Sequence, residues 1–270
     1  MGPGGPSCGV RRSRGLGTST TRRRRRSILH AWTVIKFDGA SGAELWRQAT
    51  DASNDSIFPA AQAVAVDGAA NVVAVGITNP GARPTFMVIK YDGVSGFELW
   101  RRQIGANPVG GGRAVAVDED DSVVAAGSTR AGTDFTVVKL DGASGAEVWL
   151  HVIPGGAATA VTVDRARDVV ATGFTGGAMH QFVVIKVDGA NGAELWRQSL
   201  VGGEGRAVAL DSKRDVIAAG DLNNLATVMK LDRKDGGSPK REPGADGRAA
   251  RDSERQRCGR APLRSAEGGP

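Results

Sequence analysis

Cysteine, histidine and aromatic residues are all scarce in this sequence of 270 residues. It contains two cysteines, three histidines and 5% aromatic residues. Cys8 and Cys258 are too few for a disulfide framework, a four-cysteine zinc site or an iron–sulfur cluster. No run of about 18 apolar residues is present, so the sequence predicts no membrane-spanning helix. The sequence therefore excludes disulfide-stapled, metal-cluster and helical membrane proteins.

Charge is divided unevenly along the chain. The formal net charge is +6, but residues 1–31 contain eight arginines and no acid, and the segment between the two ends is net acidic. Both ends have too few large apolar residues to bury a core, so we expect residues 1–31 and 233–270 to be disordered basic flanks. The run Arg22–Arg26 suggests nucleic-acid binding as an alternative function, although a solvated tail explains it without a ligand.

A repeated unit fills the segment between the flanks. Its first half reads WTVIKFDGASGAELWRQ at residues 32–48, and its second half reads AVAVDGAANVVAVG at residues 63–76. Both halves recur along the chain with loops of varying length between them. The units lie near residues 32–76, 86–127, 135–173 and 182–220, with a partial copy at 226–232.

The unit has the composition of a small β-sheet. Each copy holds four short apolar runs rich in Val, Ile, Phe and Trp, separated by Gly, Asp, Asn and Ser, and no run has the helical period. Four strands in about 45–55 residues match the blade of a β-propeller. Runs such as VVAAG at residues 123–127 are apolar throughout, as expected of sheets covered on both faces. The sequence predicts an all-β fold, a β-propeller-like array of about four four-stranded blades, with a solenoid β-helix as second choice.

The turn chemistry predicts which residues face each other across one hairpin. A turn between Asp38 and Gly42 pairs Lys36 with Glu44 and Val34 with Trp46. Opposite charges on neighbouring strands contribute roughly 0.2–1 kcal/mol each, so these pairs are interpreted as structural. The same geometry predicts the pairs Lys90–Glu98, Lys139–Glu147 and Lys186–Glu194. An Asx-turn is expected at each aspartate that ends an AVAVD-like run, namely Asp67, Asp118, Asp164 and Asp211.

One spacing within the unit resembles a known motif. Asp-x3-Gly-x3-Trp occurs four times and resembles the tryptophan-docking motif of PQQ-type (quinoprotein-like) propeller repeats. The resemblance implies that each tryptophan packs between adjacent blades. This sequence departs from the family pattern because a lysine, not a small residue, lies two positions before the aspartate. The second half of the unit, with DFTVVKLD at 134–141, resembles the SBBP bacterial β-propeller repeat. The predicted structural residues are Asp38, Gly42, Trp46, Asp92, Gly96, Trp100, Asp141, Gly145, Trp149, Asp188, Gly192 and Trp196.

The same resemblance raises the question of an enzyme. Quinoprotein dehydrogenases are expected to hold PQQ with calcium and a catalytic aspartate, often beneath a disulfide between adjacent cysteines. Here Cys8 and Cys258 lie in the two flanks, and no acidic trio stands out beyond the repeated residues. We therefore predict no catalytic residue, no bound cofactor and no metal site, with a PQQ-dependent oxidoreductase as the alternative.

A few ionisable residues do not recur from unit to unit. A catalytic residue should break the repeat, and five residues meet this criterion without forming a recognisable constellation. They are Asp134, Glu204, Asp221, His151 and His180.

By analogy with the family, the chain holds three whole blades and two partial ones. The whole blades are residues 63–103, 113–151 and 158–198, followed by three strands at 206–232. Residues 32–48 form a lone hairpin, whose second strand could complete the last blade and close a four-bladed ring. The alternative is an open arc. Because the pattern stops within a unit at both ends, we also expect the array to be part of a longer repeat protein.

The expected function follows from these points. The sequence predicts a non-catalytic propeller module that binds a protein partner on its loop face, with loops 49–62 and 77–85 as candidates, or that acts as a structural scaffold. Open blade edges also suggest self-association. The resemblance implies an exported, periplasmic or extracellular protein, although residues 27–33 lack the apolar core of a secretory signal.

Overall fold

The chain forms strands and turns throughout its described part. The computed structural model describes residues 30–53, 59–78, 84–105, 110–130, 133–176 and 179–237. No helix that could cross a membrane lies within these ranges. The strands are β1 (His30–Phe37), β2 (Glu44–Ser53), β3 (Ala60–Val66), β4 (Val72–Thr78), β5 (Thr85–Tyr91), β6 (Glu98–Gln103), β7 (Gly111–Val117), β8 (Val123–Thr129), β9 (Asp134–Leu140), β10 (Glu147–Pro154), β11 (Gly156–Val163), β12 (Val169–Thr175), β13 (Gln181–Val187), β14 (Glu194–Val201), β15 (Gly203–Leu210), β16 (Val216–Leu222) and β17 (Leu225–Leu231).

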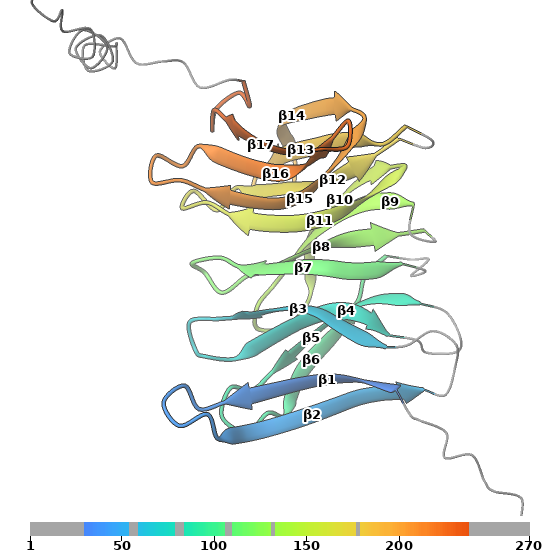
Figure 1. Ribbon diagram of the computed structural model, residues 1–270. Coiled ribbons are helices and arrows are strands. Elements are labelled where there is room, and N and C mark those ends of the chain that lie inside the picture. Colours follow the sequence, from blue (N-terminus) through green and yellow to red (C-terminus); the bar gives the residue numbers. More distant parts are fainter. Residues whose placement is uncertain are drawn as a thin grey trace, which may run out of the picture.

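The strands form five antiparallel sheets that follow the repeat. Three have four strands, β3–β6, β7–β10 and β11–β14, while β1–β2 is a lone hairpin and β15–β17 has three strands. Figure 1 shows them stacked in chain order, with β1–β2 at one end and β15–β17 at the other. The predicted all-β, propeller-like array is therefore confirmed. The closed ring is not formed, because β2 pairs with β1 and not with the last sheet.

Apolar side chains from both faces of the three four-stranded sheets form the core, together with one face of each end sheet. On β13, Phe182 and Val184 pack toward the last sheet, whereas Val183 and Ile185 pack toward the preceding one. Every residue of β5, β8 and β9 is buried. Strands covered on both faces need apolar residues at every position, which explains the continuous apolar runs.

A β-bulge changes the register of the hairpins between third and fourth strands. Lys36 lies opposite Trp46, Phe37 opposite Glu44 and Val34 opposite Gln48. The predicted pairs Lys36–Glu44 and Val34–Trp46 are therefore wrong. The other units share this irregularity, so the same correction applies to Lys90–Glu98, Lys139–Glu147 and Lys186–Glu194. The extra residue of the bulge is invisible to a symmetric count outward from the turn.

The predicted flanks lie largely outside the described residues. Of residues 1–31, only the last two are described, at the start of β1, and residues 233–237 form a turn after β17. Cys8, Cys258 and the run Arg22–Arg26 are not among the described residues, and the same holds for 54–58 and 79–83 within the two predicted binding loops.

Candidate functional site

The repeated aspartate and glycine build the turn between the third and fourth strands. Asp38 Oδ1 accepts hydrogen bonds from the backbone N–H of Ser41 at 2.7 Å and from its hydroxyl at 2.6 Å. Gly42 has a φ of 70° and donates to the Asp38 carbonyl. The hydroxyl and backbone hydrogen bonds from Ser41 hold the pKa of Asp38 below its usual value. The same backbone turn follows Asp92, Asp141, Asp188 and Asp232.

Each repeated tryptophan reaches from its own sheet to the turn of the next. The indole N–H of Trp100 donates to the Gly142 carbonyl at 3.1 Å. Its ring lies over Gly145, where a Cβ atom would be only 2.7 Å from the ring. The corresponding carbonyl acceptors and covered glycines are Gly93 and Gly96 for Trp46, Gly189 and Gly192 for Trp149, and Arg233 and Gly236 for Trp196.

A glycine covered by a tryptophan and an uncovered one in the equivalent turn position allow a matched test of the packing. Gly145 and Gly42 have almost the same φ, 69° and 70°, but nothing lies within 4 Å of a Cβ placed on Gly42. An alanine at either position costs about 1–2 kcal/mol for the left-handed backbone. Gly145→Ala should lower the free energy of unfolding by about 1–3 kcal/mol more than Gly42→Ala, because it also displaces a packed ring. Urea unfolding measures the difference, and equal losses would contradict the packing.

In each of the three four-stranded sheets, the lysine two positions before the turn is buried and paired with an aspartate of its own sheet. Lys90 Nζ lies 2.7 Å from Asp67 Oδ2 and donates to the Gly142 carbonyl at 2.7 Å. The carbonyl that accepts from Trp100 therefore also accepts from Lys90. We call this arrangement the blade joint: the Lys, Asp and Trp of one sheet with the turn of the next. Its other lysine–aspartate pairs are Lys139–Asp118 at 2.8 Å and Lys186–Asp164 at 2.9 Å.

Charge pairing in the joint outweighs the effect of burial on the pKa. Burial alone would raise the pKa of Asp67, but hydrogen bonds from Lys90 and Asn71 dominate and lower it. Burial would likewise lower the pKa of Lys186, yet bonds to Asp164 and Asp168 raise it. Asp67 also forms the predicted Asx-turn, because its Oδ1 accepts from Asn71 N at 2.8 Å. Both shifts favour the charged form of the group concerned, as expected for an ion pair.

Sequence reasoning missed the role of the lysines, although a signal was present. A lysine and an AVAVD-type aspartate both recur in the units, and opposite charges that recur together are candidates for one contact. Three of the four predicted glutamate partners pair along their own exposed strand instead, in Arg47–Glu44, Arg101–Glu98 and Arg197–Glu194. Such exposed pairs contribute about 0–1 kcal/mol.

Three of the non-repeated residues meet at the ends of the strands opposite the joints. His180 Nδ1 lies 2.5 Å from Glu204 Oε1, and the ring stacks on Phe174 with centroids 4.5 Å apart. Arg206 continues the chain of charges, at 3.3 Å from Glu204 and 2.9 Å from Asp221. We call His180, Glu204, Arg206 and Asp221 the polar cluster. It is a linked set of hydrogen bonds and ion pairs, partly open to solvent.

The other two non-repeated residues lie apart from the polar cluster. Asp134 is buried at the start of β9 and pairs with Arg130 at 3.2 Å. His151 on β10 has Nδ1 3.1 Å from the Gly192 carbonyl, beside a joint. No group of three or more metal-ligating side chains occurs among the described residues.

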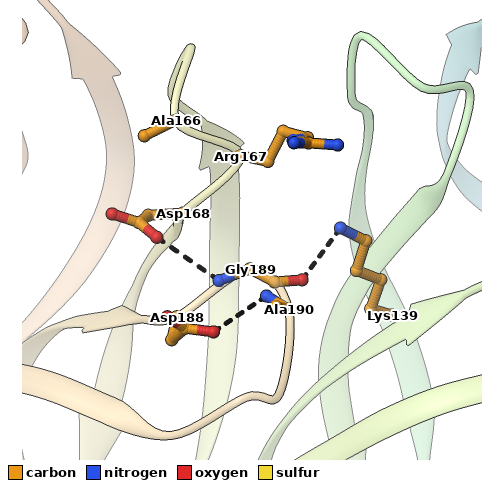
Figure 2. A pocket seen from close by; sticks show the side chains of 7 residues that line it. All are labelled: Lys139, Ala166, Arg167, Asp168, Asp188, Gly189 and Ala190. Carbon is orange, nitrogen blue, oxygen red and sulfur yellow. Dashed lines mark hydrogen bonds between the residues drawn. The ribbon is translucent and has the colours of Figure 1, made fainter.

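One cavity of about 210 Å³ opens beside a joint. Figure 2 shows Lys139 donating to the Gly189 carbonyl, Asp168 accepting from Gly189 N–H and Asp188 accepting from Ala190 N–H. Arg167, on its rim, pairs with Asp120 of the preceding sheet. Apart from Arg167, the polar groups that line the cavity are thus engaged with the joint itself.

Comparisons with known proteins agree with this architecture. The family model described as outer membrane protein assembly factor BamB matches residues 84–257. No curated protein matches the sequence.

Three solved structures illustrate the likeness. A protein of unknown function from Bacteroides caccae is 11% identical, with a TM-score of 0.48 over 76% of this chain and 70% of that one. BamB from Moraxella catarrhalis is 17% identical, with a TM-score of 0.45 over 78% and 59%. Quinohemoprotein alcohol dehydrogenase from Pseudomonas putida HK5 is 16% identical, with a TM-score of 0.48 over 65% and 32%. The chain thus spans less than two thirds of the length of the last two.

The family match covers more than half of the chain and includes strands β5 to β17. The resemblance to PQQ-type propeller repeats is thereby confirmed. The chain belongs to the family of PQQ-type β-propeller repeat proteins described as outer membrane protein assembly factor BamB.

Proposed function

We propose that the chain is a non-catalytic β-propeller module that binds a protein partner and acts as a scaffold. One observation carries this proposal: the polar residues that the unit repeats are engaged in blade joints. Lys90 and Trp100 of one sheet both donate to the Gly142 carbonyl of the next, and Asp67 pairs with Lys90. The other two four-stranded sheets repeat the arrangement. On this proposal, the repeated Asp, Gly and Trp residues and residues 32–232 as a whole form the structural framework.

The polar cluster marks the surface where we place the partner. Three of its residues, His180, Glu204 and Asp221, differ from unit to unit, and the cluster lies at strand ends, where a rigid scaffold presents variable groups for recognition. Arg206 has a side chain 64% exposed. The family description names an assembly factor of outer membrane proteins. We therefore propose an exported location and a protein partner in the cell envelope.

A quinoprotein-like oxidoreductase is the second candidate, since one neighbour is an alcohol dehydrogenase. The described cavity does not fit PQQ. Its volume of about 210 Å³ lies below the range of about 300–1,000 Å³ usual for small-molecule sites, and its polar groups are engaged in the joint.

Photo-crosslinking in the source cell tests the binding proposal. A photoreactive residue at Arg206 should give one discrete cross-linked protein, whereas the same residue at Val94, a fully open turn position, should not. Identical products at both positions, or none at Arg206, would refute the proposed surface.

An activity assay tests the non-catalytic assignment. The purified chain given PQQ and Ca²⁺ should show no dye-linked alcohol oxidation, and turnover would refute the assignment.

A further inference from the structure

The last sheet leaves one apolar face uncovered among the described residues. A valine in the middle of each third strand packs toward the next sheet. Val34, Val88, Val137 and Val184 are at most 5% exposed, whereas the equivalent Val228 on β17 is 73% exposed. We call Ile217, Ala219, Ala226 and Val228 the trailing face.

The first hairpin leaves the complementary face uncovered. The final residue of each third strand packs toward the preceding sheet. Tyr91, Leu140, Val187 and Leu231 are at most 8% exposed, whereas the equivalent Phe37 is 55% exposed. We call Thr33, Ile35 and Phe37 the leading face. Beside it, Gly42 has nothing within 4 Å of an added Cβ, although each of its later counterparts lies against a tryptophan ring, namely Gly96, Gly145, Gly192 and Gly236.

The joint lysine of the last sheet is likewise incomplete. Lys230 Nζ lies 2.6 Å from Asp211 and 3.0 Å from Asp215, as its counterparts do with their aspartates. Its side chain is 41% exposed, and no turn carbonyl accepts from it among the described residues. Lys139, by contrast, donates to the Gly189 carbonyl.

We propose that two copies of this chain join head to tail, the trailing face of one packing on the leading face of the other. In this contact Lys230 Nζ donates to the Gly39 carbonyl of the second copy. The occupant is a second copy because each half of the interface is present once, at opposite ends of the stack (Figure 1). The contact continues the packing that already joins successive sheets. This proposal does not depend on the proposed envelope partner.

The chemistry of the contact sets its symmetry and strength. The two faces differ, so the contact is heterologous and leaves one free face of each kind. The second copy brings no free tryptophan for Gly42, since the four docking tryptophans are engaged in their own chain. We therefore expect a contact weaker than the internal joints, with a dissociation constant in the micromolar range.

Sedimentation velocity of the full chain at increasing concentration tests this inference. The weight-average mass should reach at least twice the monomer mass at about 100 µM. Phe37→Asp and Val228→Asp should each remain monomeric. Mixed in equal amounts, they should form a one-to-one heterodimer and nothing larger, because each variant keeps one intact face. Val94→Asp, at a turn 91% exposed, is the matched control and should behave as wild type.

Three outcomes would overturn the inference. The first is a wild-type chain that stays monomeric at about 100 µM, as it would if its own terminal segments covered the faces. The second is a mixture of the two variants that does not associate. The third is a Val94→Asp chain that is also monomeric. Urea unfolding midpoints verify that the variants fold. If Val228→Asp does not, Ala226→Asp on the same exposed face replaces it.

Discussion

Replacing Lys139 with methionine should lower the free energy of unfolding by about 3–5 kcal/mol, because it leaves a buried carboxylate without its counterion. The ammonium group lies 2.8 Å from Asp118 and 2.9 Å from the Gly189 carbonyl, and the Asp118 side chain is fully buried. Methionine keeps most of the apolar stem and removes the charge. The loss therefore reports the ion pair more than the packing.

Lys230→Met is the matched control for this substitution. Lys230 occupies the same position in its unit and pairs with two aspartates, but its side chain is 41% exposed. We expect a loss of at most about 1 kcal/mol there. Urea unfolding at neutral pH measures both variants. Similar losses would show that the buried joint is no more important than a surface pair.

Trp100→Ala should lower the free energy of unfolding by about 3–5 kcal/mol. The indole is 9% exposed, packs on Gly145 and donates to Gly142, so its removal opens a cavity between two sheets and leaves the lysine as the sole donor to that carbonyl. The free energy of unfolding of Trp100→Phe should lie between those of the wild type and Trp100→Ala, because phenylalanine retains apolar packing but lacks the N–H donor.

Leu99→Ala tests whether the loss is specific to the joint. Leu99 is the neighbouring residue of β6, is 50% exposed and lies on the opposite side of the strand. Leu99→Ala should change the free energy of unfolding by no more than about 0.5 kcal/mol, as for surface positions generally. A loss at Leu99 equal to that at Trp100 would place the stabilising contact elsewhere.

The fold was predictable because the repeat shows the same apolar runs several times. The second and third strands of each whole blade are covered on both faces, which leaves a continuous apolar signature such as VVAAG at residues 123–127. Sheet β3–β6 spans residues 60–103, against the predicted blade at 63–103. Whether the array closes was not predictable, because strand patterns carry no information on how the first and last sheets lie relative to each other.

The site was predictable only in part, because its contacts run between sheets. Lys90 and Gly142 are 52 positions apart, so no local pattern indicates their bond. The bulge beside each lysine shifts the register and removed the expected lysine–glutamate pairs. Gly236 was overlooked because RKDGG at residues 233–237 lacks the serine or asparagine of the other turns, although Asp232-x3-Gly236 keeps the spacing and Trp196 packs on it. The likeness to SBBP repeats stays a prediction.

A double-mutant cycle on Trp100 and Gly145 tests most directly whether the repeated residues join successive blades. The two residues lie in different sheets, and a Cβ at Gly145 would meet the indole ring at 2.7 Å. Removing the ring should relieve that clash, so Gly145→Ala should cost at least about 1 kcal/mol less in the Trp100→Ala background than in the wild type. Costs that agree within about 0.5 kcal/mol would show that the two residues do not touch, and would contradict the blade joint.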